Sequence, residues 1–126
     1  EIVPRVFNHV DAIVVPSIWL ENSPLVIHEA QQARVPVITA DAGGMAELVQ
    51  HEVNGLLYEH RNPSALAAQM SRLADDPQLA IRLGQRGYLH TPDGNVPSME
   101  HHVAEIEKLY ATVLHSRIRD RREVLV

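Results

Sequence analysis

The sequence of 126 residues contains no cysteine. Disulfide bonds and thiolate metal sites are therefore excluded, and this absence fits a reducing compartment. Long apolar runs are missing too: none approaches the roughly 18 residues needed to cross a bilayer, and no signal peptide opens the chain. From these absences we expect a cytoplasmic, soluble protein with no membrane span.

Basic residues are scarce. The chain carries 11 Lys and Arg against 16 Asp and Glu, which gives a formal net charge of −5. Because nucleic-acid binding depends on clustered cations that contact phosphates, this balance argues against a nucleic-acid partner. The basic cluster near the C-terminus is interpreted as a solvated tail, and it consists of Arg117, Arg119, Arg121 and Arg122.

Short apolar segments alternate with helical patterns along the chain. The run between Asp11 and Pro16 is typical of a strand buried on both faces. Ser23 is placed to cap the next helix, with Pro24 in its first turn. We predict strands at residues 12–15, 36–39 and 56–58, and helices at residues 4–10, 24–34, 45–50, 63–75, 78–86 and 98–117.

This alternation indicates an α/β fold with a parallel sheet covered on both faces. Only three strands are visible, whereas a doubly wound sheet usually has about five or six. The chain also starts in the middle of a strand–helix alternation. We therefore expect an incomplete Rossmann-like domain, with about three parallel strands flanked by helices and its first strands absent.

Two glutamates stand out after the first strand. Glu29 shares a helix face with Leu25 and Ala33, so it lies either within an apolar stripe or at its edge with its carboxylate in water. Glu21 lies in the preceding loop, at the sheet edge where open α/β sheets bind ligands. A helix N-terminus between them offers amides to a phosphate, and carboxylates suit sugar hydroxyls. The segment is a plausible site for a sugar linked to a nucleotide.

Three further features have plain structural explanations. Gly43 and Gly44 follow the second strand and would let a ligand approach the backbone, but a tight turn is the simpler interpretation. Trp19 and Leu20 flank Glu21 and are expected to pack under the loop or against another domain. The His101, His102 and Glu105 cluster lacks a third strong metal ligand and is interpreted as a solvated helix start.

Four ordered blocks resemble the signature of retaining glycosyltransferases of family 4: residues 15–30, 34–40, 43–49 and 54–57. The resemblance implies the GT-B fold, in which two Rossmann-like domains face each other across the active-site cleft. It makes residues 1–126 part of the C-terminal nucleotide-sugar-binding domain, with the N-terminal acceptor domain absent. The last helix resembles the family only in length and amphipathicity.

Site roles are implied by the same resemblance. Glu29 would hold the ribose hydroxyls, and Glu21, the catalytic candidate, would lie near the transferred sugar. Many members have Gly at the position of Pro24, so one backbone contact is lost here. No metal or other cofactor is expected. Donor-facing backbone is implied at Ser23, Leu25 and Val26, with a possible cleft loop at Gly43 and Gly44.

The function implied is transfer of a hexose from a nucleoside-diphosphate sugar to an unknown acceptor hydroxyl, with retention at the anomeric carbon. We expect the 126-residue chain alone to be inactive. We also expect it to form a homo-oligomer, either through the edge of the strand at residues 12–15 or through the adjacent sheet face. Two alternatives stay open. One is a degenerate, non-catalytic Rossmann-like interaction module, and the other is an enzyme related by fold, such as a nucleotide-sugar epimerase or a phosphorylase.

Overall fold

The computed structural model describes residues 3–123, which divide into two units between Val96 and Pro97. The second unit contains one helix, α6 (Met99–Glu123). In chain order, the first unit contains α1 (Val3–Val6), η1 (Phe7–His9), β1 (Ile13–Val15), α2 (Leu25–Gln32), β2 (Val37–Ala40), α3 (Gly43–Leu48), β3 (Gly55–Tyr58), α4 (Pro63–Asp75) and α5 (Pro77–Arg86).

The three strands form one parallel sheet in the order β1-β2-β3, as the alternation predicts. Ile13 of β1 lies opposite Val37 of β2, which in turn lies opposite Gly55 of β3. The central strand β2 is buried at all four positions. Within the described residues β1 pairs only with β2, and Ile13 and Val14 are half-buried, so the prediction of a first strand buried on both faces was wrong.

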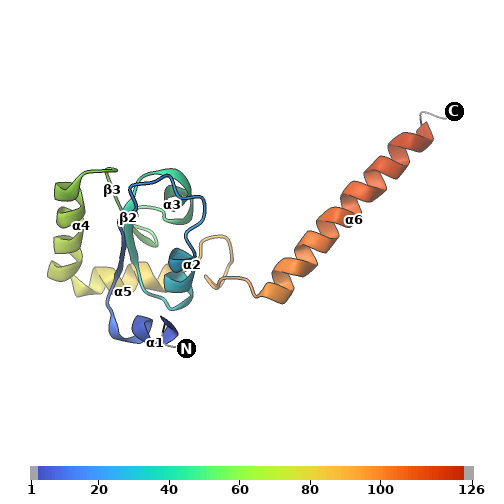
Figure 1. Cartoon of the computed structure of the whole chain (residues 1–126). Helices are drawn as coiled ribbons and strands as arrows, with labels where there is room; N and C mark the ends of the chain where they lie inside the picture. Colours follow the sequence, from blue (N-terminus) through green and yellow to red (C-terminus); the bar gives the residue numbers. More distant parts are fainter. Residues whose placement is uncertain (1–2, 124–126) are drawn as a thin grey trace. The chain divides into compact units, whose positions relative to one another are not determined.

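Helices cover both faces of this sheet (Figure 1). Helices α2 and α3 pack on β2 from one side, and α4 packs on β2 and β3 from the other. Parallel strands joined by right-handed crossovers place their connecting helices on a common face, which explains why α2 and α3 lie together. The largest fully buried apolar side chains are Ile27, Val37, Ile38, Met45, Val49, Leu56 and Leu83.

Two predicted helix starts are displaced by one or two residues. Helix α2 begins at Leu25 with Pro24 as its N-terminal cap, and no side chain caps it. The Ser23 hydroxyl lies 3.2 Å from Nε2 of His28 instead, so the prediction that Ser23 caps the helix was wrong. Helix α3 begins at Gly43 rather than Met45, and the two glycines form its first turn instead of a preceding loop.

The helical region after β3 agrees with its sequence signals. Asn62 caps α4, where its Oδ1 accepts from the amide of Ala65 at 3.0 Å. Asp76 separates α4 from α5, and its Oδ1 accepts from the amide of Leu79 at 3.1 Å. This backbone hydrogen bond holds the pKa of the Asp76 carboxyl below its usual value. The predicted break between the two helices is confirmed.

Arg34 forms several hydrogen bonds with the segment after α5. Arg34 follows α2 and adopts a positive φ of 61°. Its guanidinium donates to the carbonyl oxygens of Asp93 at 2.8 Å and Gly94 at 2.9 Å, and to Oδ1 of Asn95 at 2.7 Å. The residues between α5 and the end of this unit are therefore held at the C-terminal end of α2, the end opposite to Glu21.

Helix α6 makes up the second unit by itself, and no helix of the described residues is long and apolar enough to cross a membrane. Its predicted apolar residues recur at helical spacing, so they share one stripe of the helix. The stripe is formed by Val103, Ile106, Leu109, Tyr110, Val113 and Leu114.

Candidate functional site

The loops that follow the three strands meet at the C-terminal edge of the sheet, where open α/β sheets bind ligands. The loop after β1 carries Glu21 and leads into α2. Nε2 of His60, which follows β3, lies 3.2 Å from the carbonyl oxygen of Ile18 in this loop. At the end of β1 itself, the buried Thr39 hydroxyl donates to the carbonyl oxygen of Val15 at 3.0 Å. Elements far apart in sequence thus anchor the Glu21 loop.

Glu21 is half-buried and is held through both its side chain and its backbone. The Ser17 hydroxyl donates to Oε1 of Glu21 at 2.9 Å. The amide of Gly44 donates to the Glu21 carbonyl oxygen at 2.7 Å. The second carboxylate oxygen, Oε2, has no hydrogen bond within the described residues, so it can accept from a ligand hydroxyl.

The two glycines at the start of α3 serve the packing of this loop. A Cβ atom on Gly44 would lie 1.5 Å from the carbonyl oxygen of Asn22, and one on Gly43 would lie 2.9 Å from that of Glu21. Gly43 also has a positive φ of 53°, which L-residues with a side chain rarely adopt. The chain's own backbone, rather than empty ligand space, occupies the volume that the missing side chains leave.

Glu29 lies on the solvent-exposed side of α2. The helix buries Ile27, Ala30 and Gln31, whereas Leu25 is 74% exposed and Glu29 is exposed as well. The stripe of Leu25, Glu29 and Ala33 is therefore exposed rather than buried, and the alternative of a carboxylate in water is the one that the structure adopts. The Glu29 carboxylate forms no side-chain hydrogen bond or ion pair within the described residues, and its backbone carbonyl accepts from the amide of Ala33 at 3.0 Å.

The N-terminus of α2 is accessible beside this loop. The amides of Leu25 and Val26 lie in the first helical turn, where no earlier helical carbonyl exists to accept from them. Leu25 and Ser23 are exposed and Val26 is half-buried. Because Pro24 has no amide hydrogen, this end of the helix has one donor fewer than a glycine there would provide.

His28 connects α2 to the segment after α5. Its ring centroid lies 5.8 Å from that of Tyr88, whose ring in turn lies 5.2 Å from that of His90. Burial lowers the pKa of His28, because desolvation disfavours its charged form. The ring thus favours the neutral state while its Nε2 faces the Ser23 hydroxyl.

A cavity of about 560 Å³ opens at the ends of β2 and β3. Asp41 and Glu59, which directly follow these two strands, supply carboxylates to it, and His60 links it to the Glu21 loop. The sequence interpretation missed these residues, although their position just after predicted strands is the signal that could have found them. The lining residues are Asp41, His51, Leu57, Tyr58, Glu59, His60 and Gln69.

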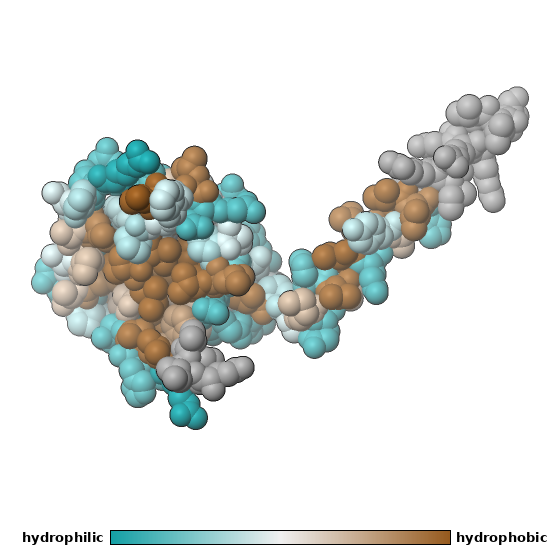
Figure 2. All heavy atoms as spheres, in the orientation of Figure 1, coloured by the Kyte–Doolittle hydropathy of each residue, from teal (hydrophilic) through white to brown (hydrophobic). Residues whose placement is uncertain are grey.

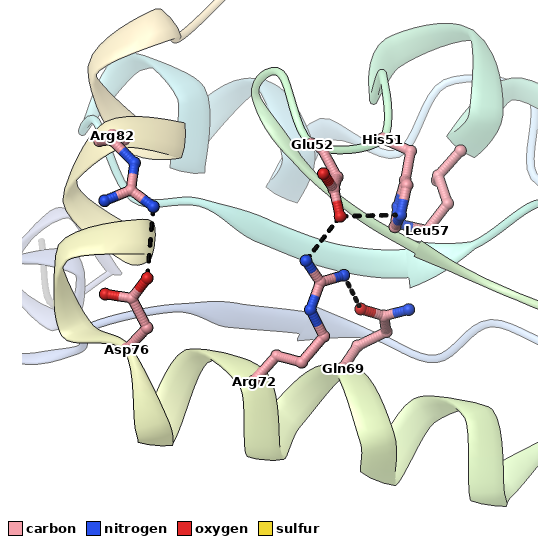
Figure 3. A network of polar contacts seen from close by, with 7 residues as sticks. All are labelled: His51, Glu52, Leu57, Gln69, Arg72, Asp76 and Arg82. Atoms are coloured by element: carbon pink, nitrogen blue, oxygen red, sulfur yellow. Dashed lines mark hydrogen bonds and ion pairs between the residues drawn. The ribbon is translucent and has the colours of Figure 1, made fainter.

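A polar network includes two side chains that line this cavity, those of His51 and Gln69 (Figure 3). Arg72 of α4 contacts Oε1 of Glu52 at 2.5 Å and donates to Oε1 of Gln69 at 3.0 Å. The arginine holds the pKa of the Glu52 carboxyl below its usual value, mainly through this hydrogen bond. Nδ1 of His51 accepts from the amide of Leu57 at 2.9 Å. The network joins α4 to the turn before β3 and fixes two lining side chains.

Two other sequence expectations can be placed. Trp19 and Leu20 are 69% and 74% exposed, so they do not pack under the loop within this chain. Among the residues that the structure describes, no three His, Cys, Asp or Glu side chains are grouped so that they could hold a metal ion. His101 and Glu105 lie one turn apart near the start of α6, where Glu105 pairs with Lys108 at 2.6 Å.

Comparison with known sequences identifies the family. The family profile described as "Glycosyl transferases group 1" matches residues 1–90. The chain belongs to the group 1 glycosyltransferases. One curated relative is the D-inositol 3-phosphate glycosyltransferase of Streptomyces scabiei (strain 87.22), which is 30% identical over 115 residues. These residues cover 91% of this chain and 25% of the relative.

Solved structures extend the comparison to the fold. The sucrose-phosphate synthase of Thermosynechococcus elongatus matches with a TM-score of 0.75 and 29% identity, over 88% of this chain and 27% of that protein. Anabaena HepE in complex with UDP-glucose matches with a TM-score of 0.72 and 26% identity, over 92% and 30% of the respective chains. The three parallel strands and their helices match GT-B glycosyltransferases, and the chain spans about a quarter of the length of the relatives it matches.

Proposed function

We propose that the C-terminal edge of this sheet binds a nucleoside-diphosphate sugar, and that the whole protein transfers its hexose to an acceptor hydroxyl with retention. The observation that carries this proposal is the arrangement of one segment. Glu21, the open N-terminus of α2 and Glu29 follow β1 within fifteen residues and are all accessible to a ligand. The complex of HepE with UDP-glucose supports this donor class.

Each group of the segment has a chemical role in the proposal. The amides of Leu25 and Val26 and the positive end of the α2 dipole face the diphosphate, whose charge they stabilise. Glu29 accepts from the two ribose hydroxyls, and Glu21 accepts from a hydroxyl of the sugar. Both carboxylates are suited to these roles, since that of Glu29 forms no hydrogen bond within the described residues and that of Glu21 keeps one oxygen free.

In the transfer step, the bond from the anomeric carbon to the diphosphate oxygen breaks, and the nucleoside diphosphate leaves with the electron pair. The acceptor oxygen bonds to the anomeric carbon on the same face and transfers its proton to the leaving diphosphate. Because negative charge grows on the leaving diphosphate, positioned amides stabilise the transition state more than the ground state. Residues outside these 126 would complete the cleft, as the relatives are about four times longer.

Calorimetric titration of the whole protein with UDP-glucose, ADP-glucose and GDP-mannose tests the proposal. We expect one donor to bind, and Glu29→Gln to weaken it about tenfold or more, because an ionised acceptor forms roughly twofold stronger hydrogen bonds than a neutral one. Glu107→Gln on α6, an exposed glutamate outside the segment, is the matched control and should bind as the wild type does.

The outcomes separate the candidate functions. Binding that Glu29→Gln leaves unchanged would remove Glu29 from the site. Binding without transfer to any acceptor, or to water, would contradict transferase activity. Failure of every donor to bind would favour the non-catalytic interaction module.

A further inference from the structure

Two hydrogen bonds hold Glu21 in place, one at its carboxylate and one at its backbone carbonyl. Ser17 lies at its start and donates its hydroxyl hydrogen to Oε1 of the Glu21 carboxylate at 2.9 Å. Gly44 lies on α3, 23 positions after Glu21, and donates its amide hydrogen to the Glu21 carbonyl oxygen at 2.7 Å. One hydrogen bond fixes the rotation of the carboxylate, and the other fixes the backbone from which the side chain extends.

The contact at Gly44 tolerates no side chain. A Cβ atom there would lie 1.5 Å from the carbonyl oxygen and 2.4 Å from the carbonyl carbon of Asn22. These atoms belong to the main chain, so no rotamer change relieves the overlap. Any larger residue at position 44 must push the Glu21 loop away from α3 by more than an ångström, since carbon and oxygen atoms in contact lie about 3.4 Å apart.

We propose that Ser17 and Gly44 are positioning residues that hold the Glu21 carboxylate in the orientation in which it contacts the transferred sugar. This inference rests on the proposed function, because the hydrogen bonds from Ser17 and Gly44 have this role only if Glu21 faces a donor sugar. Ser17 acts on the carboxylate directly, and it leaves Oε2 free for a sugar hydroxyl. Gly44 acts through the backbone, because its lack of a side chain lets α3 approach the Glu21 loop closely enough for this hydrogen bond.

Release of UDP from UDP-glucose by the whole protein, with water or an acceptor present, measures the effect. Ser17→Ala removes the hydrogen bond to a charged group, so kcat should fall about tenfold. KM for the donor should stay within about twofold, because Glu29 and the α2 amides are unchanged. Ser17→Thr retains the hydroxyl and should recover most of the lost kcat. A purely structural serine would show neither the split between kcat and KM nor this rescue.

Gly44→Ala should lower kcat about 100-fold, the loss expected when a catalytic group moves by about an ångström. Gly84→Ala is the matched control. Gly84 lies on α5, and its Cβ would approach the Arg34 carbonyl oxygen to 2.1 Å, at the end of α2 away from Glu21. This variant should lose thermal stability, as Gly44→Ala does, but keep the kcat of its folded fraction.

The results distinguish this inference from the function on which it rests. An inactive wild type with every nucleotide sugar would overturn both. Suppose instead that the wild type is active and Glu21→Gln is inactive. Full kcat in Ser17→Ala and Gly44→Ala would then overturn the positioning role alone. A loss of kcat in Gly44→Ala no larger than that in Gly84→Ala would also overturn the positioning role. A Glu21→Gln variant as active as the wild type would do the same.

Discussion

The side-chain amide of Asn54 donates to the carbonyl oxygen of Gly87 at 3.1 Å, across 33 positions of the chain. The same amide donates to the carbonyl oxygen of Leu48 at 3.1 Å, and Oδ1 accepts from the amide of Gln50 at 2.8 Å. Asn54 is only 2% exposed. One buried side chain therefore joins the end of α3, the turn before β3 and the C-terminal cap of α5.

We predict that Asn54→Ala lowers the free energy of unfolding by about 2 kcal/mol, because it removes three hydrogen bonds of a buried side chain and leaves the buried carbonyl of Gly87 without this donor. Asn8→Ala, at an exposed asparagine of η1, should change it by less than about 0.5 kcal/mol. Urea denaturation of both variants of the whole protein measures the difference. Equal midpoints for the two variants would show that water replaces the Asn54 hydrogen bonds at no cost.

His28 should make folding stability depend on pH. Burial lowers its pKa in the folded state below the ordinary value of 6.5. The unfolded chain therefore takes up a proton before the folded one does, so the contribution of His28 is complete above about pH 6.5 and is lost as the pH falls through the lowered pKa. We expect acidification from about pH 7.5 to about pH 5 to reduce the wild-type melting temperature more than that of His28→Gln. Parallel melting curves for the two proteins would rule out this contribution.

Much of the fold could be predicted from local signals. The three strands, their parallel order and the helix break at Asp76 follow from apolar runs bounded by Pro, Gly and Asn. The orientation of α2 could not be predicted. Both of its stripes contain apolar residues, Leu25 and Ala33 on one and Ile27 and Ala30 on the other. Periodicity indicates that a helix is two-sided, but tertiary packing decides which side faces the sheet.

The candidate site was predictable in its elements but not in its internal contacts. The segment after β1 was located by its place at the end of a strand and by family resemblance. The contact of Gly44 with the Glu21 loop joins residues that lie far apart in the sequence, so no local pattern reports it. A Gly-Gly pair looks the same in sequence whether a ligand or the chain's own backbone occupies the space beside it.

The 126-residue chain alone should not catalyse transfer. It spans 25% to 30% of the length of the relatives compared above, and the resemblance to family 4 places the acceptor domain and its groups in another segment of such enzymes. We expect no release of UDP from UDP-glucose above the buffer rate, under conditions in which the whole protein is active. Turnover by the purified chain, with its mass verified, would contradict the assignment of those groups to other segments.

Strand β1 forms an edge of the sheet in the described residues. Ile13 donates its amide hydrogen to the carbonyl oxygen of Pro36, so the amide and carbonyl of the next residue, Val14, point away from β2. The strand is uncharged, and Figure 2 shows a broad apolar area where β1 and α2 lie. An apolar edge with free backbone groups is prone to pair with another chain.

We therefore predict that the isolated 126-residue chain forms dimers or larger oligomers through β1. Val14→Pro removes the outward donor without removing a hydrogen bond to β2, and it should shift the equilibrium toward the monomer. The control variant is Ile81→Val, at an exposed position of α5, because a proline there would break the helix. This variant should associate as the wild type does. Light scattering over a range of concentrations measures the mass. A wild-type chain that keeps a mass of 14.1 kDa well above micromolar concentration would show that β1 does not pair in solution. Water would then satisfy the outward backbone groups of the strand.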